Sequence, residues 1–196
     1  MIQPALALIE YSSIATGMQA ADAVAKRAPI QVLKAGTIQP GKFLVLFGGL
    51  TADVEESLAA GRTVGADAVI DYVYLPNVHP EVVMAIAGGR LAEPTEALGV
   101  IETSSVAATI LAADAGVKGA RVHLVEVRLG DGLGGKGLVL YSGLVADVEA
   151  AVEIGVRVIP RPGLLIRQVV IPQLHPDMWQ NVMDSTRFRE RVLGEL

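Results

Sequence analysis

The 196-residue sequence contains no cysteine. This absence excludes disulfide bonds, thiolate nucleophiles, and zinc or iron–sulfur sites that are ligated by cysteine. Aromatic residues make up only 4% of the chain while 52% of it is hydrophobic, so Ala, Val, Leu and Ile must form most of the core. No uninterrupted apolar run approaches the roughly 18 residues that a membrane-spanning helix requires. We therefore expect no membrane segment and no cysteine-based centre.

Basic residues are outnumbered by acidic ones, which gives a net charge of −5. Because no cluster of Lys and Arg offsets this charge, a nucleic-acid partner is not expected. The opening segment MIQPALALIEYSS lacks the basic stretch and long apolar core of a secretory signal, so we expect a cytoplasmic protein. The mean hydropathy of +0.47 is high for a soluble chain. Surplus apolar surface usually marks an interface, so the composition predicts extensive burial between subunits.

The chain contains two copies of one pattern. ALALIEYSSIATGMQAADAVAKRAPI, which starts at Ala5, aligns with ALGVIETSSVAATILAADAGVKGARV, which starts at Ala97. Further along, LTADVE matches LVADVE and LPNVHP matches IPQLHP, in the same order. The sequence therefore predicts tandem domains at residues 1–88 and 97–183, joined by a linker at 89–96 and followed by a tail at 184–196.

Each copy reads as β-α-β-β-α-β followed by a short helix. This order predicts an α/β (α+β) fold in which each domain is a ferredoxin-like, split βαβ antiparallel sheet flanked by helices. In the first helix, Ile14, Met18, Ala21 and Ala25 recur with helical spacing and are expected to lie on one face. In the first copy we expect strands at 5–10, 30–36, 42–49 and 68–75, and helices at 14–28, 51–65 and 79–88.

The sequence offers no complete catalytic constellation. His79 and His175 take the same place in the two copies, before a proline at the start of the last helix. Capping or an interface role is favoured there over catalysis, because no nucleophile accompanies them. Glu10 and Glu102 end the first strand of each copy; an acid/base pair stays open, but a repeated hydrogen bond to backbone is favoured. The segment GDGLGGK lacks the spacing of a phosphate loop. We therefore expect a protein that assembles and is not an enzyme.

Two acid–base pairs also repeat. Asp22 and Lys26 are spaced i,i+4 on one helix, as are Asp114 and Lys118. These pairs are either solvated ion pairs worth a few tenths of a kcal/mol or contacts to a neighbouring subunit. The residues alone favour the solvated ion pair.

These segments resemble the shell domain of bacterial microcompartments. The opening of each copy is similar to the family's motifs ALGxIET and AADAxxKAA. The segments GGLTADVEESLAAG and SGLVADVEAAVEIG are similar to its GxVxxVxxA motif, and LPNVHP and IPQLHP are similar to its IPxPH motif. The resemblance covers nearly all of both copies. It is closest to the single-layer, trimeric tandem class found in propanediol-utilisation compartments.

The resemblance implies a structural shell protein in the shell of a cytoplasmic organelle. Its homotrimer would be a pseudohexamer that tiles with other shell proteins and passes small polar metabolites through a central pore. In the family, the loop between the second and third strands of each domain lines that pore. The implied pore-lining residues are Thr37, Ile38, Gln39, Pro40, Gly41, Gly130, Asp131, Gly132, Leu133 and Gly134.

The resemblance also implies edge residues. The family's tiling lysine falls on Lys26 and Lys118. For these lysines the resemblance therefore favours a contact to a neighbouring subunit over a solvated ion pair. The family's edge arginine falls on Asn77 and Gln173. A similar IPRPG segment at 159–163 precedes the last strand, so the role is not transferred to Arg161.

Gln39 stands where some tandem members have a cysteine that holds an iron–sulfur cluster, so no cofactor and no metal are expected. Gln39 would instead meet passing polar molecules, or hydrogen-bond its neighbours and close the hole; Asp131 would disfavour anions. The alternative class is a duplicated ferredoxin-like ligand-binding or regulatory protein.

Overall fold

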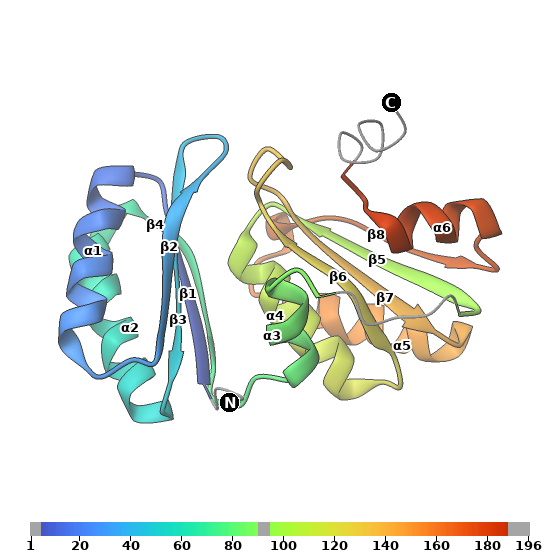
Figure 1. The fold of residues 1–196 in the computed structure, drawn as a ribbon, viewed down its shortest axis with the longest axis horizontal. Helices are drawn as coiled ribbons and strands as arrows, with labels where there is room; N and C mark the ends of the chain where they lie inside the picture. The colour runs from blue at the N-terminus through green and yellow to red at the C-terminus, as the bar shows by residue number, and fades with distance from the viewer. Residues whose placement is uncertain (1–4, 90–94, 188–196) are drawn as a thin grey trace.

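The computed structural model describes residues 5–89 and 95–187 (Figure 1). The first half contains β1 (Ala5–Tyr11), α1 (Ile14–Arg27), β2 (Val32–Ile38), β3 (Lys42–Gly49), α2 (Thr51–Gly65), the 3-10 turn η1 (Ala66–Ala68), β4 (Val69–Leu75) and α3 (Pro80–Ile86). The second half contains β5 (Ala97–Thr103), α4 (Val106–Gly119), β6 (His123–Leu129), β7 (Gly137–Gly143), α5 (Val145–Arg157), the 3-10 turn η2 (Pro162–Leu164), β8 (Leu165–Pro172) and α6 (Pro176–Asp184). The predicted linker and tail extend into residues 90–94 and 188–196, which lie outside the described ranges, so those boundaries stay predictions.

Each half forms a four-stranded sheet, in the orders β2-β3-β1-β4 and β6-β7-β5-β8. All neighbouring strands are antiparallel, and the strands joined by a helix are separated by one antiparallel strand. This is the split βαβ arrangement, so the predicted fold class is confirmed. The registers also repeat: Glu10 lies opposite Asp71, and Glu102 lies opposite Arg167.

Local capping explains where the helices begin. Ser13 and Ser105 precede α1 and α4, and their hydroxyls accept hydrogen bonds from the backbone amide of the third residue of each helix, at 3.3 and 3.2 Å. Such side-chain acceptors satisfy amides that have no partner within the helix. His79 and His175 act in the same way at α3 and α6, through Nδ1, at 3.3 and 3.2 Å. The predicted capping role of the two histidines is confirmed.

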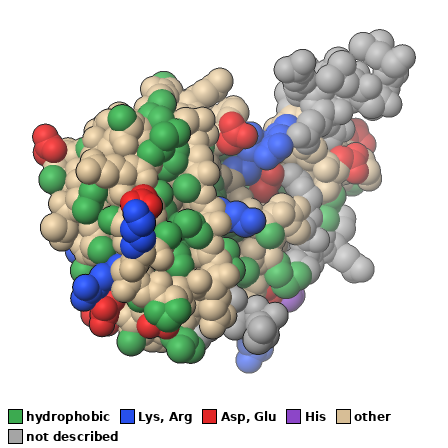
Figure 2. All heavy atoms as spheres, turned by 60° about the vertical axis from the view of Figure 1, so that its left-hand side comes forward, with side chains coloured by type: hydrophobic (Ala, Val, Ile, Leu, Met, Phe, Trp, Pro, Cys, Tyr) green, Lys and Arg blue, Asp and Glu red, His purple; other side chains and the backbone are tan. Residues whose placement is uncertain are grey.

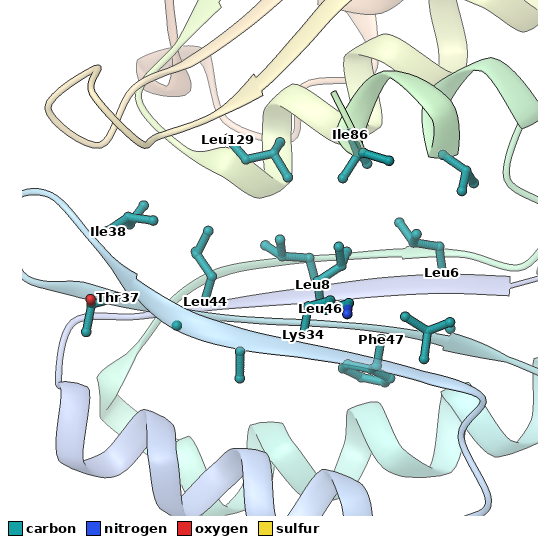
Figure 3. Close-up of a pocket in the computed structure, with 16 residues that line it drawn as sticks. Leu6, Leu8, Lys34, Thr37, Ile38, Leu44, Leu46, Phe47, Ile86 and Leu129 are labelled. Carbon is teal, nitrogen blue, oxygen red and sulfur yellow. The ribbon is translucent and has the colours of Figure 1, made fainter. Parts of the chain in front are cut away.

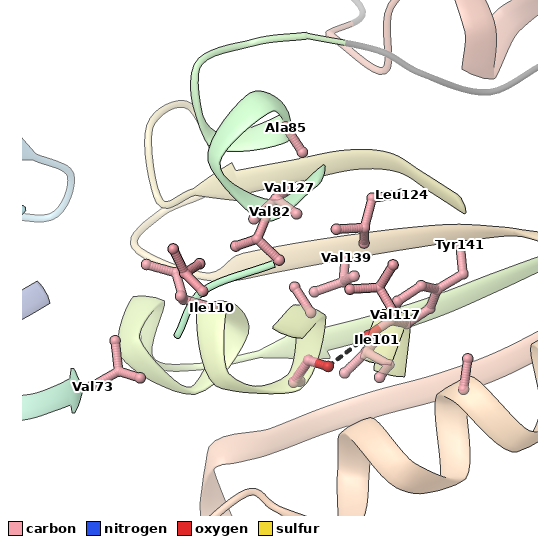
Figure 4. Packing of buried hydrophobic residues seen from close by; sticks show 14 of the residues in the cluster. Val73, Val82, Ala85, Ile101, Ile110, Val117, Leu124, Val127, Val139 and Tyr141 are labelled. Carbon is pink, nitrogen blue, oxygen red and sulfur yellow. Dashed lines mark hydrogen bonds between the residues drawn. The ribbon is translucent and has the colours of Figure 1, made fainter. Parts of the chain in front are cut away.

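Strand β1 separates two cores because alternate residues face opposite sides of the sheet. Ala7, Ile9 and Tyr11 lie in the cluster beneath α1 and α2. Leu6 and Leu8 face the other way and join the cluster that contains α3, α4 and the second sheet. Figure 4 shows this second cluster, with Val73 of the first half directed toward Ile110 of α4. The two halves therefore share one core.

Of the four apolar residues that helical spacing places on one face of the first helix, the structure buries only Ala21. The buried residues of this helix are Gly17, Ala20, Ala21 and Val24, while Ile14 and Met18 remain 37% and 56% exposed. Gly17 explains the difference, because a Cβ at this position would lie 2.6 Å from Cδ1 of Phe43. The helix thus places its smallest residues on the sheet, which turns Ile14 and Met18 outward.

The shared core gives a direct test of burial. Leu8 is fully buried in it, whereas Leu50 is 57% exposed at the start of α2. We expect Leu8→Ala to lower the free energy of unfolding by about 2–5 kcal/mol, because it removes apolar contacts and leaves a cavity. The matched change Leu50→Ala should cost less than about 0.5 kcal/mol. Guanidinium titration followed by circular dichroism measures both, and equal losses would contradict this assignment of the core.

Candidate functional site

The two halves meet along a seam between β1 and β4 of the first half and α4 of the second. Glu10 lies at its centre with no exposed surface. Its Oε1 accepts a hydrogen bond from Lys42 Nζ at 2.6 Å, and its Oε2 accepts one from the backbone amide of Val106 at 3.0 Å. Val106 is the first residue of α4, where amides lack partners and the helix dipole favours a negative charge. The favoured prediction, a hydrogen bond to backbone, is confirmed for Glu10.

A second acidic group lies next to Glu10 in the seam. Asp71 is buried in β4 and accepts a hydrogen bond from the hydroxyl of Ser105. Its other oxygen lies 3.4 Å from Nη2 of Arg161, which also donates to the carbonyl oxygen of Ile70 at 3.3 Å. Sequence reasoning left Arg161 without a role, because its partner comes from the other half and the motif itself does not indicate it.

The segment that connects β4 to α3 lies on α4 and β6. The amide of His79 donates to Asp114 Oδ1 at 2.8 Å, and Lys118 donates both to Asp114 and to the carbonyl oxygen of Asn77. At the start of α3, the carboxylate of Glu81 accepts a hydrogen bond from the amide of Leu124 at 2.9 Å. The structure thus brings together two of the four predicted edge residues, Lys118 and Asn77, across the seam.

The other two predicted edge residues stay apart. Lys26 lies on α1 and pairs with Asp22 at 2.6 Å, with 73% of its side chain exposed. Gln173 follows β8, and in Figure 1 α1 and the β8–α6 region lie at opposite ends of the molecule. A contact between Lys26 and Gln173 requires a second chain, so their edge role stays a prediction.

The two loops with predicted pore-lining residues lie side by side at the upper edge of the view in Figure 1, between the two sheets. Close packing of these loops depends on glycine. A Cβ at Gly130 would lie 2.5 Å from Cδ1 of Ile38, and one at Gly135 would lie 2.8 Å from the carbonyl oxygen of Gln39. Both glycines also have φ of +82°, which side chains rarely permit. The loops therefore form one unit within the chain.

A shallow hollow lies between this loop unit and Ile14 at the start of α1. Thr37, Ile38, Gln39 and Gly41 line it from the first loop and Asp131 from the second. The second loop is held in place by Arg128, which donates to the carbonyl oxygen of Asp131 and to Thr186 Oγ1, each at 3.2 Å. Neither Arg128 nor Thr186 carried a signal in the sequence, because the two are brought together only by the fold.

A larger cavity of about 470 Å³ lies between the first sheet and α3 (Figure 3). Leu6, Leu8, Leu44 and Leu46 point into it from the sheet, and Ile86 and Leu129 lie above them. Only Lys34 and Thr37 among its described lining residues have polar side chains. A specific ligand site normally combines apolar walls with several converging polar groups, so this cavity does not favour the ligand-binding alternative.

Within residues 5–89 and 95–187, no cluster of His, Asp and Glu has the arrangement of a metal site. None of the helices described there is long and apolar enough to span a bilayer.

The model of the BMC domain family matches residues 5–78 and 97–174. The chain belongs to this family. The bacterial microcompartment shell protein PduT of Citrobacter freundii is 40% identical over 92% of this chain and 98% of its own length. The shell protein EutM of Salmonella typhimurium is 44% identical over 42% of this chain and 84% of its own. A crystal structure of a microcompartment protein from Desulfitobacterium hafniense superposes with a TM-score of 0.79, at 44% identity, over 90% of this chain and 98% of that one. The predicted tandem-domain membership is therefore confirmed.

The seam is tested most directly at Glu10. Removing one partner of a buried ion pair costs about 3–5 kcal/mol, and we expect the lower end for Glu10→Ala because Lys42 is 19% exposed and can regain water. The control Glu153→Ala breaks an exposed i,i+4 pair with Arg157 and should cost less than about 0.5 kcal/mol. Both values come from denaturant titration. A neutral Glu10→Ala would show that the seam does not rest on this carboxylate.

Proposed function

We propose that the chain is a structural shell protein of a bacterial microcompartment, and that it acts as a homotrimer in which six domains surround a central opening. Membership of the BMC domain family and likeness to PduT over almost the whole chain support the shell role. The main observation in favour of a trimer is the seam. Each half of the chain has the two kinds of surface that form a seam, but within one chain only one surface of each kind is covered.

Equivalent elements differ sharply in burial. Helix α4 has ten buried residues and α1 has four; β6 has four and β2 has none. On the opposite side of the seam, β4 has three buried residues and β8 has none. Figure 2 brings the first-half end forward, where hydrophobic side chains reach the surface among a few charged ones. The uncovered surfaces are thus α1 and β2 at one end, and β8 and α6 at the other.

In the repeat, the uncovered α1 and β2 are equivalent to α4 and β6, and the uncovered β8 is equivalent to β4. The surfaces of α4 and β4 already contact each other within the chain. Ile14 and Met18 of α1 correspond to Val106 and Ile110 of α4, which are fully buried in the seam. A second chain that places its β8 against α1 would bury them in the same way. Such a head-to-tail contact forms a ring when the rotation closes, and a step of one sixth of a turn per domain closes with three chains.

Glu102 supports the same contact. Its Oε1 binds Lys136 at 2.8 Å, as Glu10 binds Lys42, but it stays 31% exposed. The equivalent of Val106 is Ile14, at the start of α1. In the ring, Glu102 of one chain would accept a hydrogen bond from the Ile14 amide of the next, just as Glu10 does from Val106.

We propose further that three copies of each loop surround the axis. Gln39 would offer both donors and an acceptor to a small polar molecule, and three Asp131 carboxylates would disfavour anions. No enzymatic role is proposed, because the buried carboxylates of the seam, Glu10 and Asp71, are already paired with Lys42, Ser105 and Arg161. The shell would lie in the cytoplasm, with other shell proteins at the edges of each trimer.

The residues of the first loop do not fit an iron–sulfur cluster. Gln39 presents a neutral amide and the chain has no thiol, whereas protein-held clusters depend on thiolates. We therefore expect protein produced with ample iron and sulfide to be colourless, without the visible absorption of a cluster. Gln39→Cys, reconstituted in the same way, serves as the positive control for three thiolates around an axis. Cluster absorption in the unchanged protein would contradict this interpretation of the loop.

Assembly is tested by mass and by shape. In sedimentation equilibrium, the protein should have a mass three times the 20.5 kDa of one chain. It should also form sheets that are visible by electron microscopy. Lys26 is the equivalent of Lys118, so in the ring it would lie near Gln173 of the next chain, and Lys26→Asp should loosen the trimer and abolish sheets. Lys118 is kept unchanged in this test, since it contacts Asn77 across the seam within the chain. A monomer at micromolar concentration would refute the trimer, and normal sheets from Lys26→Asp would place the tiling contact elsewhere.

A further inference from the structure

The two kinds of seam in the proposed ring would differ in charge at one position. The strand registers make the equivalence exact to the residue: Glu10 lies opposite Asp71 in the first sheet, and Glu102 lies opposite Arg167 in the second. Both pairings end in a register shift at the next residue of the central strand. The acid that faces α4 within the chain is therefore replaced by a base, Arg167, on the surface that would face the α1 of a second chain.

The groups that face these positions can be matched in the same way. The turns η1 and η2 directly precede β4 and β8, and each accepts one amide hydrogen bond from the central strand's end: Ser12 to Ala68 at 2.8 Å, and Ser104 to Leu164 at 2.9 Å. This alignment places Gly65 at the equivalent of Arg161, so no base is available there. It places an acid, Asp67, at the equivalent of Gly163, two residues further along.

We propose that Arg167 of one chain forms an ion pair with Asp67 of the next, so that acid and base exchange sides between the two seams. Within the chain, the acid is on the strand (Asp71) and the base is beside the turn (Arg161). Between chains, the base is on the strand and the acid is in the turn. This pairing rests on the proposed trimer.

The surroundings of both residues suit the exchange. The side chains of Arg167 and Asp67 are exposed, and neither forms an ion pair with another described residue; Glu102, which lies opposite Arg167, pairs with Lys136. Arg62, the basic residue nearest to Asp67 in sequence, is held over the ring of Tyr72 at 3.8 Å and does not neutralise it. Ser105 donates its hydroxyl proton to Asp71, and its equivalent Ser13 would use the same hydroxyl as an acceptor for Arg167. A serine at this position therefore fits either charge.

The exchange would also select the correct neighbour. If the first half of one chain took the place of the second half against another chain, Asp71 would face the Asp67 turn, and two carboxylates would meet. If two second halves met, Arg167 would face Arg161. Like charges held together at an interface disfavour a contact strongly and suppress wrong partners. The charges would thus enforce alternation of the two domain types around the ring.

A charge-reversal cycle tests the pairing. The variants are Arg167→Asp, Asp67→Arg and the double variant that carries both, each compared with the unchanged chain. Subunit exchange between trimers that carry two different fluorescent labels is followed at low salt. We expect each single reversal to speed exchange about tenfold, because interface changes act mainly on dissociation, and the double variant to return to within about twofold of the original rate. High salt should reduce the difference between variants.

Arg157→Asp is the matched control, because it reverses an exposed arginine that already pairs with Glu153 on α5. It should not change the exchange rate. If Arg167→Asp does not fold, as judged by circular dichroism, Arg167→Ala takes its place. Arg167→Ala and Asp67→Arg should then each speed subunit exchange. If the unchanged chain sediments as a monomer, the proposed trimer is wrong. A stable trimer whose exchange is unaffected by the reversals, or not restored in the double variant, would overturn only the Arg167–Asp67 pairing.

Discussion

The buried carboxylate of Glu10 is the constraint on which the arrangement of the two halves depends. A charge removed from water is tolerated only when its oxygens are paired, and here one oxygen binds Lys42 and the other the first amide of α4. The second contact crosses from one half of the chain to the other, so it aligns the start of α4 with the end of β1. Asp71, Ser105 and Arg161 form a second polar contact beside it, and the apolar core that the halves share continues from there.

This alignment explains where the apolar surplus of the composition lies. The seam covers α4 and β6 but leaves their equivalents, α1 and β2, uncovered at one end of the molecule. At the other end, Ile166, Val169 and Ile171 of β8 remain exposed. The chain has one complete seam and two uncovered seam surfaces, and association with copies of itself would bury these two surfaces. Membership of the BMC domain family agrees with such an assembly.

The seam also connects the features that the sequence motifs marked separately. The loops after β2 and β6 lie side by side because the seam turns the loop ends of the two sheets toward the same side of the molecule, and glycines at 130 and 135 allow their close packing. Lys118 and Asn77 meet at the same boundary. One interface, the seam, therefore positions both the two loops and the contact between Lys118 and Asn77.

The sequence by itself determined the repeat, the order of elements, the split βαβ sheets and the helix caps, because these depend on periodicity and on local hydrogen bonding. It also indicated that Glu10 binds backbone, although not which backbone. The tertiary structure decided which copies of the repeated residues meet. Lys26 and Lys118 are equivalent in sequence and each pairs with an aspartate on its own helix, yet only Lys118 also contacts the other half of the chain, at Asn77. The outward turn of Ile14 and Met18 follows from the packing of Gly17 against Phe43, and the roles of Asp71 and Arg161 follow from contacts between the two halves. No local pattern carries a signal for contacts between residues so far apart in the sequence.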